Sequence, residues 1–307
     1  MIRFYMPGGD LSAAERREQL NKQFDAFLRS EAFAEILSVT GTDAEGLARI
    51  YGARRKASGG IMETQDMEAS PELEEHREIL YPLFQELGFI DINEPLDMAE
   101  GCPTRIVILG GALGTCFDRI GYSRQYVTAG TASVDALTCY RPINPVERRR
   151  EDIVSSADTE FGAMGEAMEQ VYGLKGKEWT ERFSGDRNLN SISCIRAYDS
   201  GRYRLFSAPS QEPDRRRADT GDCLCFYLDE TRPGGEDSIL AITSNRYCNR
   251  QFIQMAYEMI GRDCPAHLDV IGCRRGETLH SVEDYDPLQY MQDLIGILDW
   301  IERFGRL

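Results

Sequence analysis

The chain has 307 residues, of which 42% are apolar and 28% charged, as expected of a globular protein with one large domain or two ordinary ones. A net charge of −16 argues against nucleic acid or an anionic membrane surface as the main partner. No apolar run approaches the ~20 residues of a membrane helix, and the N-terminal apolar stretch is too short for a secretory signal, so we expect a cytoplasmic protein.

The first hundred residues are predicted to form a helical subdomain. Capping boxes at Ser12-x-x-Glu15 and Thr42-x-x-Glu45 each indicate a helix start. We expect Ser58-Gly59-Gly60 to end the second of these helices. A third is predicted to begin at Ser70-Pro71 and run to Gly88, because serine caps helices well and proline fits their first turn.

Residues 101–307 are predicted to form an α/β domain, because apolar strand patterns there alternate with amphipathic helix patterns. The expected strands are Arg105–Leu109, Ala136–Tyr140, Ser193–Ala197, Tyr203–Ser207, Ser238–Thr243 and His267–Ile271. The expected helices are Thr159–Tyr172, Ala218–Asp229, Cys248–Ile260 and Pro287–Phe304. The polar stretch 173–190 is interpreted as a long loop. The fold class is therefore a Rossmann-like, open and mostly parallel sheet flanked by helices.

The first strand of this domain ends in a glycine turn. Arg105–Leu109 is followed by Gly110 and Gly111, and Arg119 comes shortly after. Glycine lets a backbone approach a ligand closely, so we expect Gly110, Gly111 and Arg119 to contact one. The turn is not a full GxGxxG fingerprint, and a plain strand-to-helix turn is the alternative.

Two acidic residues near the second strand are candidates for catalysis. Arg141 and Glu147 lie on a loop fixed by prolines, and Glu160 opens the next helix. Glu147 or Glu160 would serve as general base or metal ligand, and Arg141 would hold an anionic oxygen. An ion pair on an ordered turn is the alternative for Arg141 and Glu147, and capping is the alternative for the start of the helix.

Two further strand ends carry polar and basic residues. The candidates for ligand contacts are Ser210, Arg217, Thr220, Ser244, Tyr247 and Arg250. Guanidinium groups and amides at a helix start both suit phosphate or carboxylate oxygens. Solvated arginines and ordinary caps are the alternatives.

Histidine and cysteine chemistry is not supported by the sequence. His76, His267 and His280 lie far from any candidate nucleophile and from one another. The nine cysteines are irregularly spaced without a CxxC pair, which argues against disulfides and structural zinc. Cys223 and Cys225 are expected to be small buried thiols on a helix.

Taken together, these motifs resemble those of the SanA/YdcF-like proteins, a Rossmann-like family of largely unknown function. The resemblance covers about Arg105 to Ile271. The matching positions are Ile106 to Gly111, Arg119, Glu160, Met164, Thr220, Thr243, Ser244, Tyr247 and Arg250. Asp219 replaces the family's asparagine, and the common histidine of the last turn is absent.

The resemblance implies a ligand but no single reaction. Some members of the family are similar to S-adenosylmethionine-binding proteins, and others are membrane-anchored proteins linked to envelope or lipid-carrier metabolism. We expect this chain to be closer to the soluble members. The residues themselves favour a protein that binds a small anionic, phosphorylated or nucleotide-like molecule in an arginine-lined cleft, as a hydrolase or transferase.

Two alternatives and several details stay open at this stage. One alternative is a non-catalytic module that binds S-adenosylmethionine or a nucleotide, and a weaker one is an NAD-type dehydrogenase. S-adenosylmethionine and a divalent metal are the cofactors considered, and the oligomeric state is not predicted.

Overall fold

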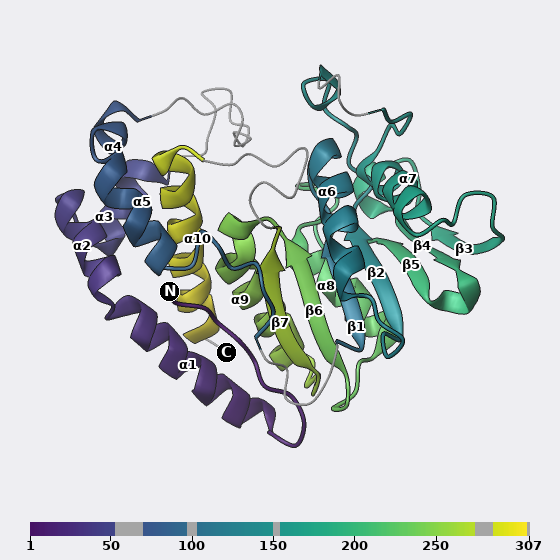
Figure 1. Cartoon of the computed structure of the whole chain (residues 1–307), viewed down its shortest axis with the longest axis horizontal. Helices are drawn as coiled ribbons and strands as arrows, with labels where there is room; N and C mark the ends of the chain where they lie inside the picture. Colours follow the sequence, from purple (N-terminus) through teal and green to yellow (C-terminus); the bar gives the residue numbers. More distant parts are fainter. Residues whose placement is uncertain (53–69, 97–102, 150–153, 274–284, 306–307) are drawn as a thin grey trace.

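A seven-stranded sheet organises the fold, with the strand order β3-β4-β5-β2-β1-β6-β7. The computed structural model describes residues 1–52, 70–96, 103–149, 154–273 and 285–305. Figure 1 shows the sheet between two layers of helices, with the N-terminal helices gathered beside α9 (Cys248–Gly261) and α10 (Pro287–Gly305). The predicted α/β fold is confirmed.

The five strands from β5 to β7 are mutually parallel, whereas β3 and β4 run antiparallel to their neighbours. The strands are β1 Arg105–Leu109, β2 Ser133–Thr138, β3 Trp179–Ser184, β4 Ser193–Tyr198, β5 Tyr203–Ser207, β6 Ser238–Thr243 and β7 His267–Gly272. The chain moves outward from β1 to β2 and β5, then returns to the other side of β1 as β6. In sheets of this type, ligands bind at the carboxyl ends of the strands beside such a reversal, which here are β1 and β6.

Alternate residues of β1 build two separate cores. Ile106 and Ile108 pack under α6 (Leu113–Ser123) and α7 (Glu160–Val171). Val107 and Leu109 belong to a larger core with α8 (Thr220–Thr231), α9, α10 and the N-terminal helices. A strand buried on both faces needs apolar residues at every position, which explains the unbroken run Ile106–Leu109.

The N-terminal region is helical as predicted, with one helix, Glu31–Val39, that was not predicted. The helices are α1 Ala13–Leu28, α2 Glu31–Val39, α3 Ala44–Tyr51, α4 Pro71–Glu75 and α5 Arg77–Glu86. The capping box of Ser12 and Glu15 is confirmed. Phe4, Phe24 and Phe304 pack edge to face in the shared core, so these helices are joined to the end of the chain.

Two details of the N-terminal prediction are wrong. Asp43, not Thr42, caps α3, because its carboxylate accepts the N–H of Gly46 at 2.7 Å. The third predicted helix divides at His76, whose backbone (φ −101°, ψ 9°) departs from helical values, into α4 and α5. The expected stop at Ser58-Gly59-Gly60 lies outside the described residues.

The stretch 173–190 is not the uninterrupted loop that we expected, because it contains β3. All six residues of β3 are exposed, so the strand lacks the buried apolar alternation that identifies strands in a sequence. It forms instead by antiparallel pairing with β4. The second strand is also shifted, since β2 ends at Thr138 and Tyr140 lies beyond it.

None of the helices in the described parts of the chain combines the length and apolar character needed to cross a bilayer.

Candidate active site

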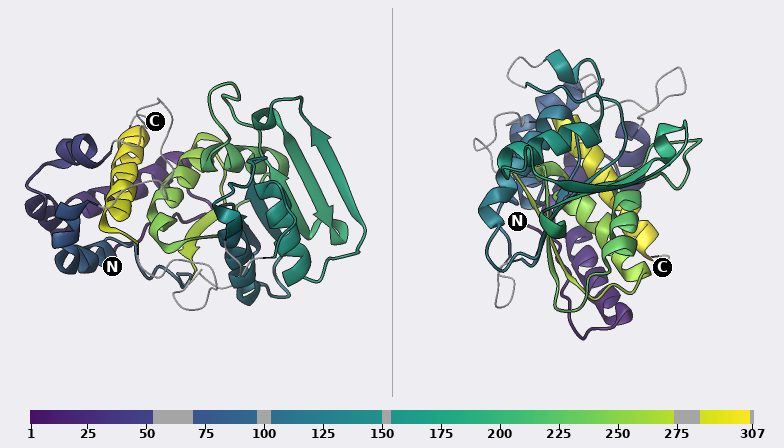
Figure 2. Two further views of the ribbon diagram at one scale, coloured as in Figure 1. Left: turned by 90° about the horizontal axis from the view of Figure 1, so that it is seen from above. Right: turned by 90° about the vertical axis from the view of Figure 1, so that its right-hand side faces the viewer.

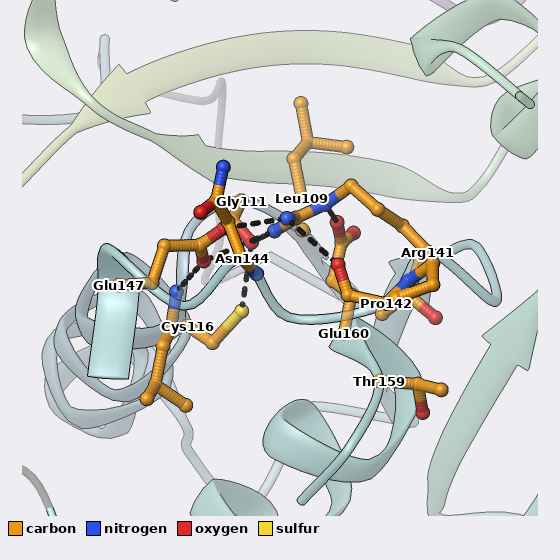
Figure 3. Close-up of polar contacts among 12 residues, drawn as sticks. Leu109, Gly111, Cys116, Arg141, Pro142, Asn144, Glu147, Thr159 and Glu160 are labelled. Carbon is orange, nitrogen blue, oxygen red and sulfur yellow. Dashed lines mark hydrogen bonds and ion pairs between the residues drawn. The ribbon is translucent and has the colours of Figure 1, made fainter. Parts of the chain in front are cut away.

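Arg141 occupies the centre of a polar cluster at the carboxyl ends of β1 and β2 (Figure 3). Its Nε donates to Glu160 Oε2 at 2.9 Å, and its Nη1 donates to Glu147 Oε1 at 2.6 Å. Its Nη2 donates to the carbonyl oxygen of Gly111 at 2.8 Å. All three nitrogens of the guanidinium therefore have partners within the protein, and the ion pair named as an alternative from the sequence is present.

Glu160 is held against the glycine turn by the start of α7. Thr159 caps this helix by accepting the N–H of Gly162, and the backbone N–H of Glu160 donates to Arg141 O at 2.8 Å. A methyl group added at Gly110 would meet Glu160 Oε1 at 2.0 Å. Gly110 is thus required for the carboxylate to lie on the backbone of the turn.

Burial raises the pKa of Glu160, although the charge and hydrogen bond of Arg141 act to lower it, followed by the charges of Arg217 and Arg119. Removal of a carboxylate from water favours its protonated form, and here this effect outweighs the surrounding arginines. A buried carboxyl whose pKa is raised by its surroundings is a candidate general acid or base.

Glu147 has a different environment from Glu160. It begins the short 3₁₀ helix Glu147–Arg149, and its Oε2 accepts the N–H of Leu113 at 2.7 Å. Burial acts to raise its pKa, but the hydrogen bond and charge of Arg141, with the N–H groups of Leu113 and Asn144, lower it. Glu147 is therefore ionised at the N-terminus of α6, where the N-cap residue Ala112 provides no side-chain acceptor.

Arg119 joins the glycine turn to the end of β6. Its Nη1 donates to the carbonyl oxygens of Leu109 and Gly110, and its Nη2 donates to Ser244 Oγ at 3.1 Å. The side chain is buried, and no carboxylate in the described ranges lies within ion-pair distance of it. Arg119 therefore places a positive charge at the carboxyl ends of β1 and β6.

The remaining predicted residues near β5 and β6 have local roles. Arg217 is exposed and acts on the Glu160 carboxyl through its charge. Thr220 accepts a hydrogen bond from Gln251 at 3.2 Å, and Gln251 also pairs with Thr243 at the end of β6. Ser210 accepts the N–H of Glu212 at 3.0 Å within its own turn.

Tyr247 and Arg250 belong to a second cluster, against α10. Arg250 Nη1 lies 2.7 Å from Asp293 Oδ1, and Arg246 Nε lies 3.1 Å from Asp293 Oδ2. The guanidinium carbon of Arg246 lies 4.4 Å from the centre of the Tyr247 ring. The structure thus brings Arg119, Arg141 and Arg217 around Glu160, but directs Arg250 elsewhere.

Sequence reasoning missed Asp293 and the structural role of Arg246. Asp293 is fully buried on α10, in a stretch from Tyr290 to Ile295 in which every side chain is buried. The signal available in the sequence was an acidic residue inside an apolar helix, because a carboxylate in such a place needs a cationic partner.

The thiols beside the cluster are poor nucleophiles. Burial raises the pKa of Cys116 and of Cys139 to about 12, so both remain protonated at neutral pH. In the parts of the chain that the structure describes, no group of three or more His, Cys, Asp or Glu side chains is arranged to hold a metal ion.

Comparison with known proteins identifies no relative: no protein-family model, no curated protein and no solved structure matches the chain.

Proposed function

We propose that the protein binds a small anionic, phosphorylated or nucleotide-like molecule at the carboxyl edge of β1, β2, β5 and β6, and acts on it as a hydrolase or transferase. The observation that carries the proposal is the buried Glu160 carboxyl, which has a raised pKa and lies within the field of three arginines. The glycine turn lies beside the strand reversal at β1 and β6, the position at which ligands bind in sheets of this type.

Glu160 would exchange a proton with the reacting group, because burial raises its pKa and the carboxyl lies against the glycine turn. Arg119 and Arg217 would stabilise negative charge that develops on the substrate, since guanidinium groups suit phosphate oxygens. Arg141 would position Glu160 through the 2.9 Å hydrogen bond from its Nε.

Glu147 would have to leave for an anion to reach the start of α6. Its carboxylate takes the N–H of Leu113 and the Nη1 donor of Arg141. A phosphate at a helix N-terminus prefers such donors. Ligand binding would therefore be accompanied by movement of the turn that carries Glu147.

Membership of the SanA/YdcF-like family is part of the proposal. Its support is that several motif positions contact one another, since Gly110 adjoins Glu160 and Arg119 bonds to Ser244. The family's similarity to S-adenosylmethionine-binding proteins makes this cofactor the first to test.

A non-catalytic binding module is the second candidate. Two observations favour it. All three guanidinium nitrogens of Arg141 donate hydrogen bonds within the protein, and the thiol of Cys116 beside it is protonated. Such a cluster could hold a ligand site open without taking part in a reaction.

Thermal-shift titrations with AMP, a sugar phosphate and S-adenosylmethionine would test binding. We expect at least one phosphate-bearing compound to raise the melting temperature of the wild type, and Arg141→Gln to remove this shift. Arg215→Gln is the matched control, because Arg215 is exposed and pairs only locally with Glu212. No shift with any compound would contradict the proposal, and binding without turnover in ³¹P NMR would select the module instead.

A further inference from the structure

The two edges of the sheet differ in how they are covered. At the β7 edge, Met6 and Leu268 exchange two backbone hydrogen bonds of 3.1 and 3.0 Å, and the N–H of Gly272 donates to Ile92 O. At the opposite edge, β3 bonds to β4, and no other described segment pairs with its outer side. Figure 1 and the left view of Figure 2 show the β3–β4 pair at the far end of the sheet.

The charged residues of β3 do not protect this edge in the usual way. Charged side chains on an edge strand ordinarily discourage pairing with another chain. Here Glu181 is paired with Arg196 of β4 at 2.9 Å, and Arg182 is paired with Glu230 of α8. Both charges are therefore balanced within the chain.

On the face of β3 that carries Glu181, the side chains before and after it are aromatic. Trp179 and Phe183 are 47% and 52% exposed, and both lie on the same face as Glu181 because side chains alternate along a strand. Contacts within the chain hold both aromatic side chains in place. The Arg196 guanidinium carbon lies 4.5 Å from the centre of the Trp179 ring, and the centre of the Phe183 ring lies 6.2 Å from that of Tyr140.

We propose that β3 pairs antiparallel with β3 of a second copy of this chain, across a twofold axis at Glu181. An antiparallel pair related by such an axis places residues of one face opposite residues of the same face. Trp179 would then lie opposite Phe183 of the partner subunit, and Thr180 opposite Arg182 of the partner subunit. The two sheets would join into one.

This register places the exposed aromatic side chains of the two copies opposite one another. Each aromatic pair would cover side chains that are now half exposed, and cross-strand aromatic pairs stabilise sheets. The two Glu181 carboxylates would face each other, but each has an Arg196 guanidinium beside it. Because a single strand pair forms a small interface, the dimer should dissociate on dilution.

Sedimentation equilibrium of the full chain from about 1 to about 200 µM would test the proposal. We expect a monomer–dimer equilibrium for the wild type and for Ile79→Lys, which changes a similarly exposed residue on α5. Phe183→Lys should weaken association at least tenfold with an unchanged circular dichroism spectrum. A wild type that stays monomeric, or a Phe183→Lys variant that dimerises as well as the wild type, would overturn the inference.

Cysteine cross-linking tests the register and does not depend on Phe183. Under mild oxidation Glu181→Cys should form a disulfide-linked dimer, because only the central residue faces its own copy. Thr180→Cys and Arg182→Cys should cross-link at least tenfold more slowly. The eight native cysteines in the described ranges are buried, so the wild type provides the background. Equal cross-linking at all three positions would refute the proposed axis.

Discussion

Two charged clusters at the carboxyl edge of the sheet have opposite compositions. In the first, one guanidinium, Arg141, pairs with two carboxylates, Glu147 and Glu160. In the second, one carboxylate, Asp293, pairs with two guanidinium groups, Arg246 and Arg250. Both clusters are largely buried.

The difference decides which cluster can change its charge. A carboxylate that loses its partner can take up a proton, whereas a guanidinium remains charged at any physiological pH. The cluster around Arg141 can therefore adapt to a ligand or a proton, as Glu160 with its raised pKa indicates. In the cluster around Asp293, two guanidinium groups that stay charged share one carboxylate, and the Arg250 pair joins α9 to α10, so we assign this cluster a structural role.

Loss of Asp293 should have the largest effect. Asp293→Asn leaves the buried Arg246 and the neighbouring Arg250 without this carboxylate, and removal of one partner of a buried ion pair typically costs about 3–5 kcal/mol. Urea unfolding of the wild type and the variant at the same pH measures this loss. The control is Asp299→Asn on the same helix, which is exposed and should cost less than about 0.5 kcal/mol. An equal effect of both substitutions would remove the structural assignment.

Loss of Arg141 should be smaller and should depend on pH. Arg141→Met leaves two carboxylates without their guanidinium, and we expect a loss of about 1–3 kcal/mol at about pH 8. Arg141 lowers the pKa of Glu147, so its stabilising effect is present above the ordinary carboxyl pKa and is lost as the pH falls through the lowered value. The difference in unfolding free energy between wild type and variant should shrink toward acid pH. A constant difference would mean that the two clusters do not differ in adaptability.

The sequence predicted the elements that carry the first cluster better than the contacts within it. The strand Arg105–Leu109 has the predicted bounds, because an apolar run ending in a turn is a local signal. The helix α7 begins one residue after its predicted start, whereas β2 is shifted. The approach of Glu160 to Gly110 joins residues that are distant along the chain, and local patterns do not contain that information.

The misses have physical causes of the same kind. The exposed strand β3 forms because it pairs with β4, and a sequence pattern of buried residues does not indicate such a strand. Arg250 was expected to face the ligand because it follows a strand end, but it pairs with Asp293 on α10. Asp293 lies 43 positions further along the chain, so a local pattern could not indicate this partner. The sequence thus indicated several of the charged residues that form the clusters, but most of their ion-pair partners could be found only from the fold.

Substitution of Glu160 should change how the free energy of unfolding depends on pH. The folded-state pKa of Glu160 is raised above its ordinary value of 4.5, so the wild type loses stability as the pH rises from about 4.5 to the raised value. Glu160→Gln has no such titration, and its stability relative to the wild type should increase over this interval. Urea unfolding across the interval measures the difference. If the stability of Glu160→Gln relative to the wild type decreases with pH, then the effect of Arg141 on the pKa of Glu160 is larger than the effect of burial.

The smallest effect on stability, and the most informative for function, is expected for Glu147. Glu147→Gln keeps the shape of the side chain and an oxygen that can accept the N–H of Leu113, but removes the charge at the start of α6. We expect a cost of about 0.5 kcal/mol, the lower end of the range for a lost helix cap. Because the carboxylate occupies donors that an anion would use, the variant should bind inorganic phosphate more tightly than the wild type in isothermal titration. Glu35→Gln, a change of an exposed residue on α2, is the control and should leave affinity unchanged. Equal phosphate affinity in all three proteins would mean that Glu147 does not compete with the ligand, and the first cluster would then be as rigid as the second.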